Sequence, residues 1–286
     1  MIALMMISVL AASAYSCILN KTSVKNKNDV IIFNIICSAV WFVILLSVNG
    51  ATLNINYHTL VWGIIYGMVQ SLFILFKTEA MSTGPVSVTT LIGNSSLLIS
   101  IFVYFIVWNE SINFWDIVGL LCLCIAIFLC TYKKPEGNST SKWKYYVVLF
   151  LVFAAMVGIT FKAFGKSQAA EFSGDMMAIS ALVMVVFYTV AGLISGGLSV
   201  KNVECGSIKK FCLAALASGV LSCAYNRLNI FLASKLDAII FFPSFNGGVV
   251  LLSMLLSILI CRERLSKVQI IGIVMGIASI CIIGIL

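Results

Sequence analysis

Long apolar runs separated by short polar segments are the dominant pattern along this chain. Two runs have the same length and similar ends: GPVSVTTLIGNSSLLISIFVYFIVWNE from Gly84 to Glu110, and DAIIFFPSFNGGVVLLSMLLSILICRE from Asp237 to Glu263. A helix needs about 20 apolar residues to cross the hydrocarbon core of a bilayer. Such continuous runs predict membrane-spanning helices, whereas a barrel would show ten-residue alternating segments.

The pattern predicts ten spans. Their ranges are 1–20, 29–48, 58–78, 84–108, 113–132, 143–165, 174–195, 209–233, 237–260 and 267–286. We interpret the first as a retained span, because it has neither the basic start nor the cleavage site of a signal peptide. Composition agrees with this prediction, since 62% of residues are hydrophobic and 10% are charged, against about 25% charged in a soluble domain. We therefore expect an all-α, multi-pass protein of the cell (cytoplasmic or inner) membrane.

The two similar runs indicate an internal repeat. Shifting the second half back by 153 positions places Glu263 on Glu110 and Gly272 on Gly119. The polar pairs that follow each glutamate also align, since Asn113 and Asp116 meet Ser266 and Gln269. That spacing is typical of a capping box, which pairs the open backbone donors at a helix start. A chance match between two hydrophobic hairpins is the alternative interpretation.

If the repeat is real, the halves are 1–132 and 143–286, joined by a polar linker at 133–142. Each half holds five spans, an odd number, so the second half enters the membrane in the opposite direction. Inverted repeats of this kind place a substrate site near the bilayer midplane, between the halves.

The chain resembles the drug/metabolite transporter superfamily. The resemblance lies in the doubled segment with its glutamate, the capped turn and the glycine-containing last helix, in a chain of ten predicted spans. Its EamA-type branch fits best, over Ala80–Leu129 and Ala233–Ile282. This resemblance implies ten helices in two inverted five-helix repeats around a central cavity, and export of a small metabolite. Arg264 and Leu265 follow the second glutamate as usual in the family, whereas Ser111 and Ile112 follow the first.

Charge predicts an orientation. In the ten-span prediction, connections after odd-numbered spans hold fourteen Lys and Arg residues, and those after even-numbered spans hold only Lys166 and Lys235. The positive-inside rule makes the odd connections cytoplasmic and both termini external, whereas the family resemblance implies internal termini. The fourteen are Lys21, Lys25, Lys27, Lys77, Lys133, Lys134, Lys142, Lys144, Lys201, Lys209, Lys210, Arg262, Arg264 and Lys267. We attribute the net charge of +8 to anionic lipid and not to nucleic acid.

Polar residues inside spans are costly and are candidate functional residues. The stretch YNRLN supplies Tyr225, Asn226, Arg227 and Asn229. Arg227 could hold a substrate carboxylate or phosphate by paired hydrogen bonds. The alternatives are that its side chain extends to the interface or pairs with Asp237 or another carboxylate.

Three further groups are candidates for the substrate site. Lys162 could meet an anion, although extension of its ammonium to water is the preferred interpretation. Trp62, Tyr66 and Gln70 share one face of the third span and could bind a ligand or pack against a neighbouring helix. The third group lies in spans four and nine, where both segments are expected to break at similar depth. Small residues there either let helices approach closely or line a cavity, and cavity lining is the preferred interpretation. It comprises Asn94, Ser95 and Asn246, with Pro243, Gly247 and Gly248 as hinge or kink positions.

Other motifs indicate structure. Glu110 and Glu263 would lie at hairpins beside helix starts, where a carboxylate complements the helix dipole. Gly119, Leu120 and Gly272 would serve packing. With a single histidine, His58, and no Cys/His cluster, the chain predicts no metal, no cofactor and no enzyme activity.

We therefore expect a secondary transporter of small polar metabolites, amino-acid-like or carboxylate-bearing, that works by alternating access. A carrier or flippase of lipid-linked or nucleotide-sugar substrates is the alternative, and a membrane-embedded enzyme is a further one. The expected partners are a small-molecule substrate and the lipid bilayer, without nucleic acid.

Overall fold

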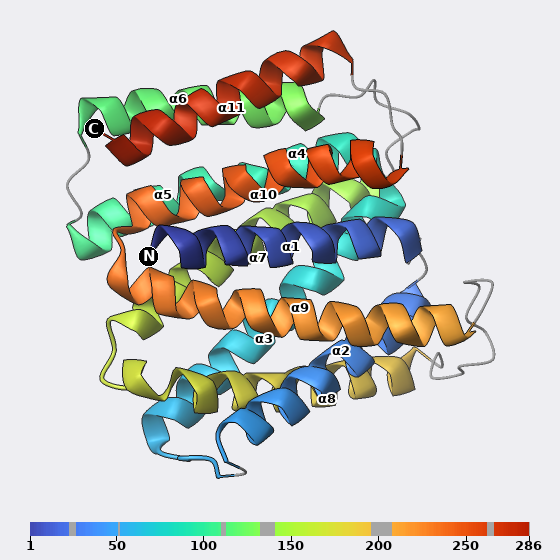
Figure 1. The fold of residues 1–286 in the computed structure, drawn as a ribbon. Helices are drawn as coiled ribbons and strands as arrows, with labels where there is room; N and C mark the ends of the chain where they lie inside the picture. Colours follow the sequence, from blue (N-terminus) through green and yellow to red (C-terminus); the bar gives the residue numbers. More distant parts are fainter. Residues whose placement is uncertain are drawn as a thin grey trace.

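The structure is a computed structural model that describes residues 1–22, 27–50, 52–109, 113–131, 141–195, 208–261 and 266–285. In those ranges the regular structure is helical throughout (Figure 1). The helices are α1 (Ile2–Thr22), α2 (Lys27–Val48), α3 (Tyr57–Thr83), α4 (Val86–Asn94), α5 (Ser96–Trp108), α6 (Phe114–Thr131), α7 (Ser141–Gly165), η1 (Ala170–Phe172), α8 (Ser173–Ile194), α9 (Ile208–Lys235), α10 (Ala238–Cys261) and α11 (Lys267–Ile285).

Each predicted span coincides with helical structure, with ends that agree within five residues. The segment 84–108 is divided, because the backbone leaves the α-helical pattern at Ser95, between α4 and α5. Within the described ranges, eight helical segments are long and apolar enough to cross a membrane, with α4 and α5 counted as one. The apolar stretches of α6 and α11, 114–130 and 267–283, are shorter. The chain is thus an all-helical, multi-pass membrane protein.

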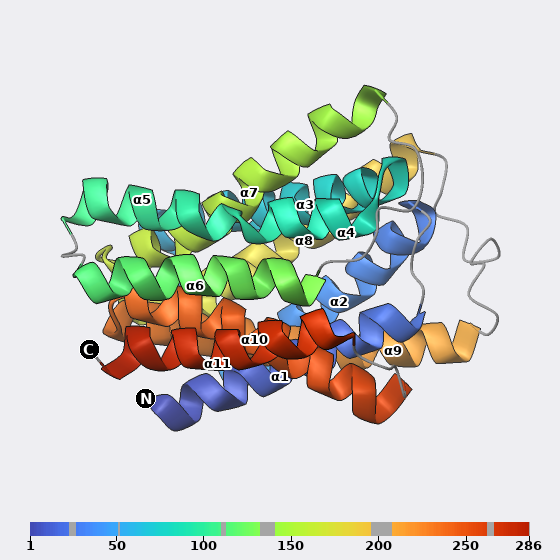
Figure 2. The same cartoon turned by 90° about the horizontal axis from the view of Figure 1, so that it is seen from above.

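The helices lie side by side, and the start of α1 and the end of α11 are at the same end of the bundle (Figures 1 and 2). One edge is the pair α6 and α11, and the opposite edge is the pair α2 and α8 (Figure 1). Between these edges α1 packs on α9 and α10, while α7 packs on α3 and α5. In addition, α2 contacts α9 and α3 contacts α8.

Glycines allow the helix pairs to approach closely, as is common in membranes. A Cβ on Gly119 of α6 would lie 2.5 Å from the Ile283 side chain of α11. Across the same pair, a Cβ on Gly272 would lie 2.9 Å from the backbone nitrogen of Cys130 and 3.0 Å from the carbonyl of Ala126. The predicted packing role of these two glycines is confirmed.

The predicted helix caps are present before α6 and α11. At Ser266 the box is reciprocal: its backbone N–H donates to Gln269 Oε1 at 2.9 Å, and the Gln269 N–H donates to the Ser266 hydroxyl at 3.3 Å. At Asn113 the N–H donates to Asp116 Oδ2 at 2.9 Å, which is one half of a box. Glu110 and Glu263, the predicted hairpin glutamates, lie outside the described residues, as does most of the predicted linker.

Exposed lysines gather at one end of the bundle. Lys142, Lys144, Lys209, Lys210 and Lys267 are exposed near the starts of α7, α9 and α11, at the end opposite the termini (Figure 2). The other end carries exposed Lys166 and Lys235. Lys77, predicted in a connection, lies inside α3 instead, because that helix continues to Thr83.

Candidate functional site

A buried polar network joins α1, α3 and α9. The Tyr66 hydroxyl donates to Asn226 Oδ1 at 3.1 Å, and Asn226 Nδ2 donates to the Ser222 carbonyl at 2.8 Å. One turn further along α9, Asn229 Oδ1 accepts a 2.6 Å bond from the Ser8 hydroxyl. All of these residues are buried. Two members of the YNRLN stretch, Asn226 and Asn229, therefore bond to neighbouring helices, which satisfies their polar groups inside the bundle.

The aromatic candidates pack against other aromatic rings. The Tyr66 ring lies 4.9 Å from that of Phe161 in α7, and Trp62 lies edge-on to Phe164 in the same helix. The Tyr225 ring lies between Tyr15 of α1 and Phe245 of α10, with centroids 5.9 and 6.3 Å away. The rings on α3 thus contribute to helix packing.

Two amide candidates keep buried polar atoms without a hydrogen-bond partner in the described part of the chain. These atoms are Oε1 of Gln70 in α3 and Nδ2 of Asn94 at the end of α4. Leaving such a group unpaired costs about 1–3 kcal/mol. A ligand group that reached these atoms would supply the missing hydrogen bonds, so Gln70 and Asn94 remain candidates.

Spans four and nine differ in helix continuity, although the sequence predicted a similar break in both. Ser95 is exposed at the break after α4, and its hydroxyl bonds the Leu91 carbonyl. In contrast, α10 continues through Pro243, and Asn246 bonds the Phe242 carbonyl one turn earlier. The expected matching break in span nine is therefore wrong. Gly247 and Gly248 lie in close contact with neighbouring helices.

The contacts of those two glycines indicate packing. A Cβ on Gly247 would lie 2.8 Å from Leu123 of α6, and one on Gly248 would lie 3.3 Å from Val9 of α1. Both distances are short enough to require a neighbour to move. We assign the two glycines to helix packing, and Pro243 is accommodated within a continuous helix.

Lys162 does not extend to water, contrary to the preferred interpretation of the sequence. Its side chain is only 2% exposed, and Nζ lies 3.5 Å from the carbonyl oxygen of Leu236, just beyond the end of α9. The last carbonyls of a helix lack partners within it, and a cation is favourable there. Lys162 thus links α7 to the end of α9.

Arg227 is less fully satisfied than Lys162 in the described part of the chain. It lies eight residues before the end of α9, or about 12 Å along the axis at 1.5 Å per residue. Its Nη1 atom is buried, with no hydrogen-bond partner in the described residues. No carboxylate of these residues, Asp237 included, forms an ion pair with it. The proposed ion pair with Asp237 is therefore absent.

The guanidinium lies against the start of α8. A Cβ on Gly174 would lie 2.2 Å from Arg227 Nη1 and 2.8 Å from Asn49 Oδ1, so those two atoms are near each other. The other end of the same Asn49 amide, Nδ2, donates to Asp175 Oδ1 at 2.9 Å. Asp175 is only 7% exposed. We call Arg227, Asn49, Gly174 and Asp175 the Arg227 cluster.

Three members of this cluster were missed in the sequence. Asn49 follows α2, while Gly174 and Asp175 lie in the first turn of α8, far from Arg227 along the chain. An aspartate at the start of a predicted span was the available signal. It did not stand out, because a carboxylate in the first turn of a helix is ordinarily explained by the helix dipole.

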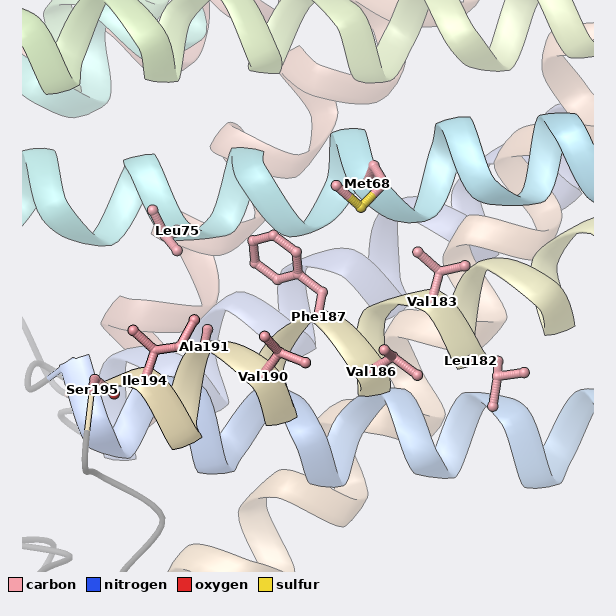
Figure 3. A pocket seen from close by; sticks show the side chains of 10 residues that line it. All are labelled: Met68, Leu75, Leu182, Val183, Val186, Phe187, Val190, Ala191, Ile194 and Ser195. Carbon is pink, nitrogen blue, oxygen red and sulfur yellow. The ribbon is translucent and has the colours of Figure 1, made fainter.

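A separate apolar groove lies on the outer surface between α3 and α8 (Figure 3). Its volume is about 610 Å³. Met68 and Leu75 line it from α3, and residues between Leu182 and Ser195 line it from α8. Leu75 also lines a smaller pocket with Glu79 and Tyr188. In a membrane this groove would contact lipid.

Comparisons with known proteins support the fold. No family model matches the chain. An uncharacterized protein of Haemophilus influenzae (strain ATCC 51907 / DSM 11121 / KW20 / Rd) is 23% identical over 221 residues, which cover 74% of this chain and 71% of that protein. A protein of known crystal structure matches with a TM-score of 0.78 over 99% of this chain and 95% of that one, at 14% identity. At this identity the match establishes a shared fold alone.

Proposed function

We propose that the chain consists of two inverted five-helix repeats that together make ten spans. The helix bounds support this proposal. Shifted by 153 positions, α3 becomes 210–236, α4 with α5 becomes 239–261, and α6 becomes 267–284. Each shifted range agrees within two residues with α9, α10 and α11, respectively. The two caps, before α6 and α11, occupy equivalent positions.

The packing pattern gives independent support. In this repeat α1, α2, α3 and α5 of the first half correspond to α7, α8, α9 and α10 of the second. The α1–α9 contact then has the α7–α3 contact as its equivalent. Likewise α2–α9 corresponds to α8–α3, and α1–α10 corresponds to α7–α5, and all of these contacts occur. The pairs α2–α8 and α6–α11 exchange with themselves and form the two opposite edges (Figure 1). This pattern is expected if a twofold axis passes through both edge pairs, and it favours membership of the EamA-type branch of the drug/metabolite transporters.

Within this architecture we propose a secondary transporter of small carboxylate-bearing metabolites in the cell membrane, working by alternating access. The observation that carries it is the buried, unpartnered Nη1 of Arg227. Arg227 as a whole is half-buried, and a charged side chain within a membrane span without a counter-ion is unfavourable; such residues mark substrate pathways. A substrate carboxylate would supply the missing acceptor and the missing charge together.

A second candidate is a carrier of lipid-linked substrates. The apolar groove between α3 and α8 favours it, because an acyl chain could lie along that surface while a head group reached the bundle. Arg227 would then bind a head-group phosphate.

Uptake into proteoliposomes tests the proposal. The wild-type chain is compared with Arg227→Ala and with the matched control Lys210→Ala, which removes an exposed charge from the same helix. We expect saturable uptake of at least one amino acid or organic acid, reduced at least about tenfold by Arg227→Ala and unchanged by Lys210→Ala. Equal uptake by all three proteins would refute the role of Arg227. Movement of fluorescent phospholipid without metabolite uptake would favour the lipid-linked candidate.

A further inference from the structure

The Arg227 cluster places a buried carboxylate beside the proposed anion site. Asn49 Oδ1 and Arg227 Nη1 both lie close to Gly174, and Asn49 Nδ2 donates to Asp175 Oδ1 at 2.9 Å. The described part of the chain records no ion pair between Arg227 and Asp175. The cluster therefore holds two opposite charges that are close in space but not in contact.

The position of Asp175 is only partly explained by the start of α8. A carboxylate in the first turn is stabilised by the helix dipole, but by no more than about 2 kcal/mol. A carboxylate with 7% exposure normally needs a cation or several donors. Its hydrogen bond in the described residues comes from one neutral amide, that of Asn49. The carboxylate thus retains acceptor capacity beyond that bond.

We infer that Asp175 is the second pole of the substrate site, and that the site selects a zwitterion, with the carboxylate of the ligand at Arg227 and its ammonium group at Asp175. This inference rests on the proposed function. A free amino acid carries both charges within a few ångströms, as the cluster requires. A bound amino acid would pair both the Arg227 and the Asp175 charge. A simple carboxylate would instead bring a negative charge close to Asp175 and leave that residue without a cation.

Gly174 explains how the poles come close. Because it has no side chain, the Arg227 guanidinium can lie directly on the backbone one residue before Asp175. Asn49 holds the Asp175 carboxylate through its hydrogen bond and is a positioning residue.

Ligand binding by the purified full-length chain tests the inference. The probes are the proteinogenic amino acids and, for each, the carboxylic acid with hydrogen in place of the α-ammonium, measured by isothermal titration calorimetry at pH 7.5. The wild-type protein should bind at least one amino acid about tenfold or more tighter than its des-amino partner, because a charge-assisted bond is lost. Asp175→Asn should weaken the binding of that amino acid and bring the ratio of the two dissociation constants close to one. The matched control Glu171→Gln, which neutralises an exposed carboxylate nearby, should leave the ratio unchanged.

The outcomes separate this inference from the proposed function. Zwitterion selection is wrong if the wild-type protein binds both members of each pair equally, or if Asp175→Asn keeps the preference for the amino acid. In that case a loss of all binding in Arg227→Ala would still support the carboxylate site. If Arg227→Ala keeps full binding, the proposed site itself fails. The comparison on wild-type protein needs no variant, so it decides the question even if Asp175→Asn does not fold.

Discussion

At the scale of single residues, the charges inside this bundle differ in how they are satisfied. Lys162 meets the Leu236 carbonyl near the end of α9, a position where a cation is ordinarily favourable. Arg227, in the same region of the bundle, leaves Nη1 buried and unpaired among the described residues. Sequence alone ranked Arg227 as a candidate but gave no means of separating these two cations, because both lie near the ends of apolar runs.

Gly174→Ala should displace Arg227 without removing its charge. The added methyl would lie 2.2 Å from Nη1, the flexible end of the side chain, so we expect a stability loss of at most about 1–3 kcal/mol. A displacement of about 1 Å can lower a rate by about a hundredfold, so uptake should fall at least about tenfold. Uptake assays with thermal unfolding in detergent measure both effects. Ser173→Ala, the neighbouring change, is the control, and wild-type uptake by Gly174→Ala would contradict the site.

At the scale of helices, the sequence predicted most of the fold. Membrane spans require unbroken hydrogen-bonded helices of defined length, and the apolar runs therefore mark their positions. The caps at Asn113 and Ser266 were also readable, because capping depends on local spacing. The sequence did not predict that span four is interrupted while span nine is continuous. Ser95 interrupts one segment whereas Pro243 does not interrupt the other, and tertiary packing decides such cases.

The helix caps before α6 and α11 should contribute unequally to stability. Gln269→Ala should destabilise the protein more than Asp116→Ala, because Gln269 both caps α11 and donates through Nε2 to the Cys130 carbonyl of α6 at 3.3 Å. We expect about 1 kcal/mol for loss of the Asp116 cap and about 1–3 kcal/mol for Gln269. Thermal unfolding in one detergent measures both. A smaller effect at Gln269 would show that its bond to α6 contributes little.

The glycines of the α6–α11 pair give a second comparison. A Cβ on Gly272 would meet backbone atoms of α6, while one on Gly119 would meet the movable side chain of Ile283. Gly272→Ala should therefore cost about 1–3 kcal/mol, and Gly119→Ala less. Unfolding temperatures of the two variants test this order, and the reverse order would show that the pair can separate at Gly272.

At the scale of the whole molecule, charge predicts how the protein sits in the membrane. The exposed lysines near helix starts lie at the end opposite the termini (Figure 2). By the positive-inside rule we expect this basic end to be cytoplasmic and both termini to be external. The family resemblance implies the opposite orientation, and the distribution of lysines favours external termini.

Orientation is measured with protease-cleavable tags at both termini, expressed separately in intact cells. We expect cleavage of both tags by added protease without opening of the membrane. A tag inserted between Val200 and Lys201, in the connection before α9, should be cleaved only after lysis. Protection of both terminal tags in intact cells would reverse the orientation but leave the fold unaffected. Cleavage of only one terminal tag would contradict the proposed ten spans, because an even number places both termini on one side.

We propose that this bundle carries a substrate across the membrane by alternating access at Arg227. Counterflow measures such transport most directly, because vesicles loaded with unlabelled substrate accumulate external label transiently only when a carrier exchanges one molecule for another. We expect a transient peak of label for a carboxylate-bearing metabolite in wild-type and Lys210→Ala vesicles, and its loss in Arg227→Ala. Equilibration of label without a transient peak, or an undiminished peak in Arg227→Ala, would show that Arg227 is not part of a carrier site.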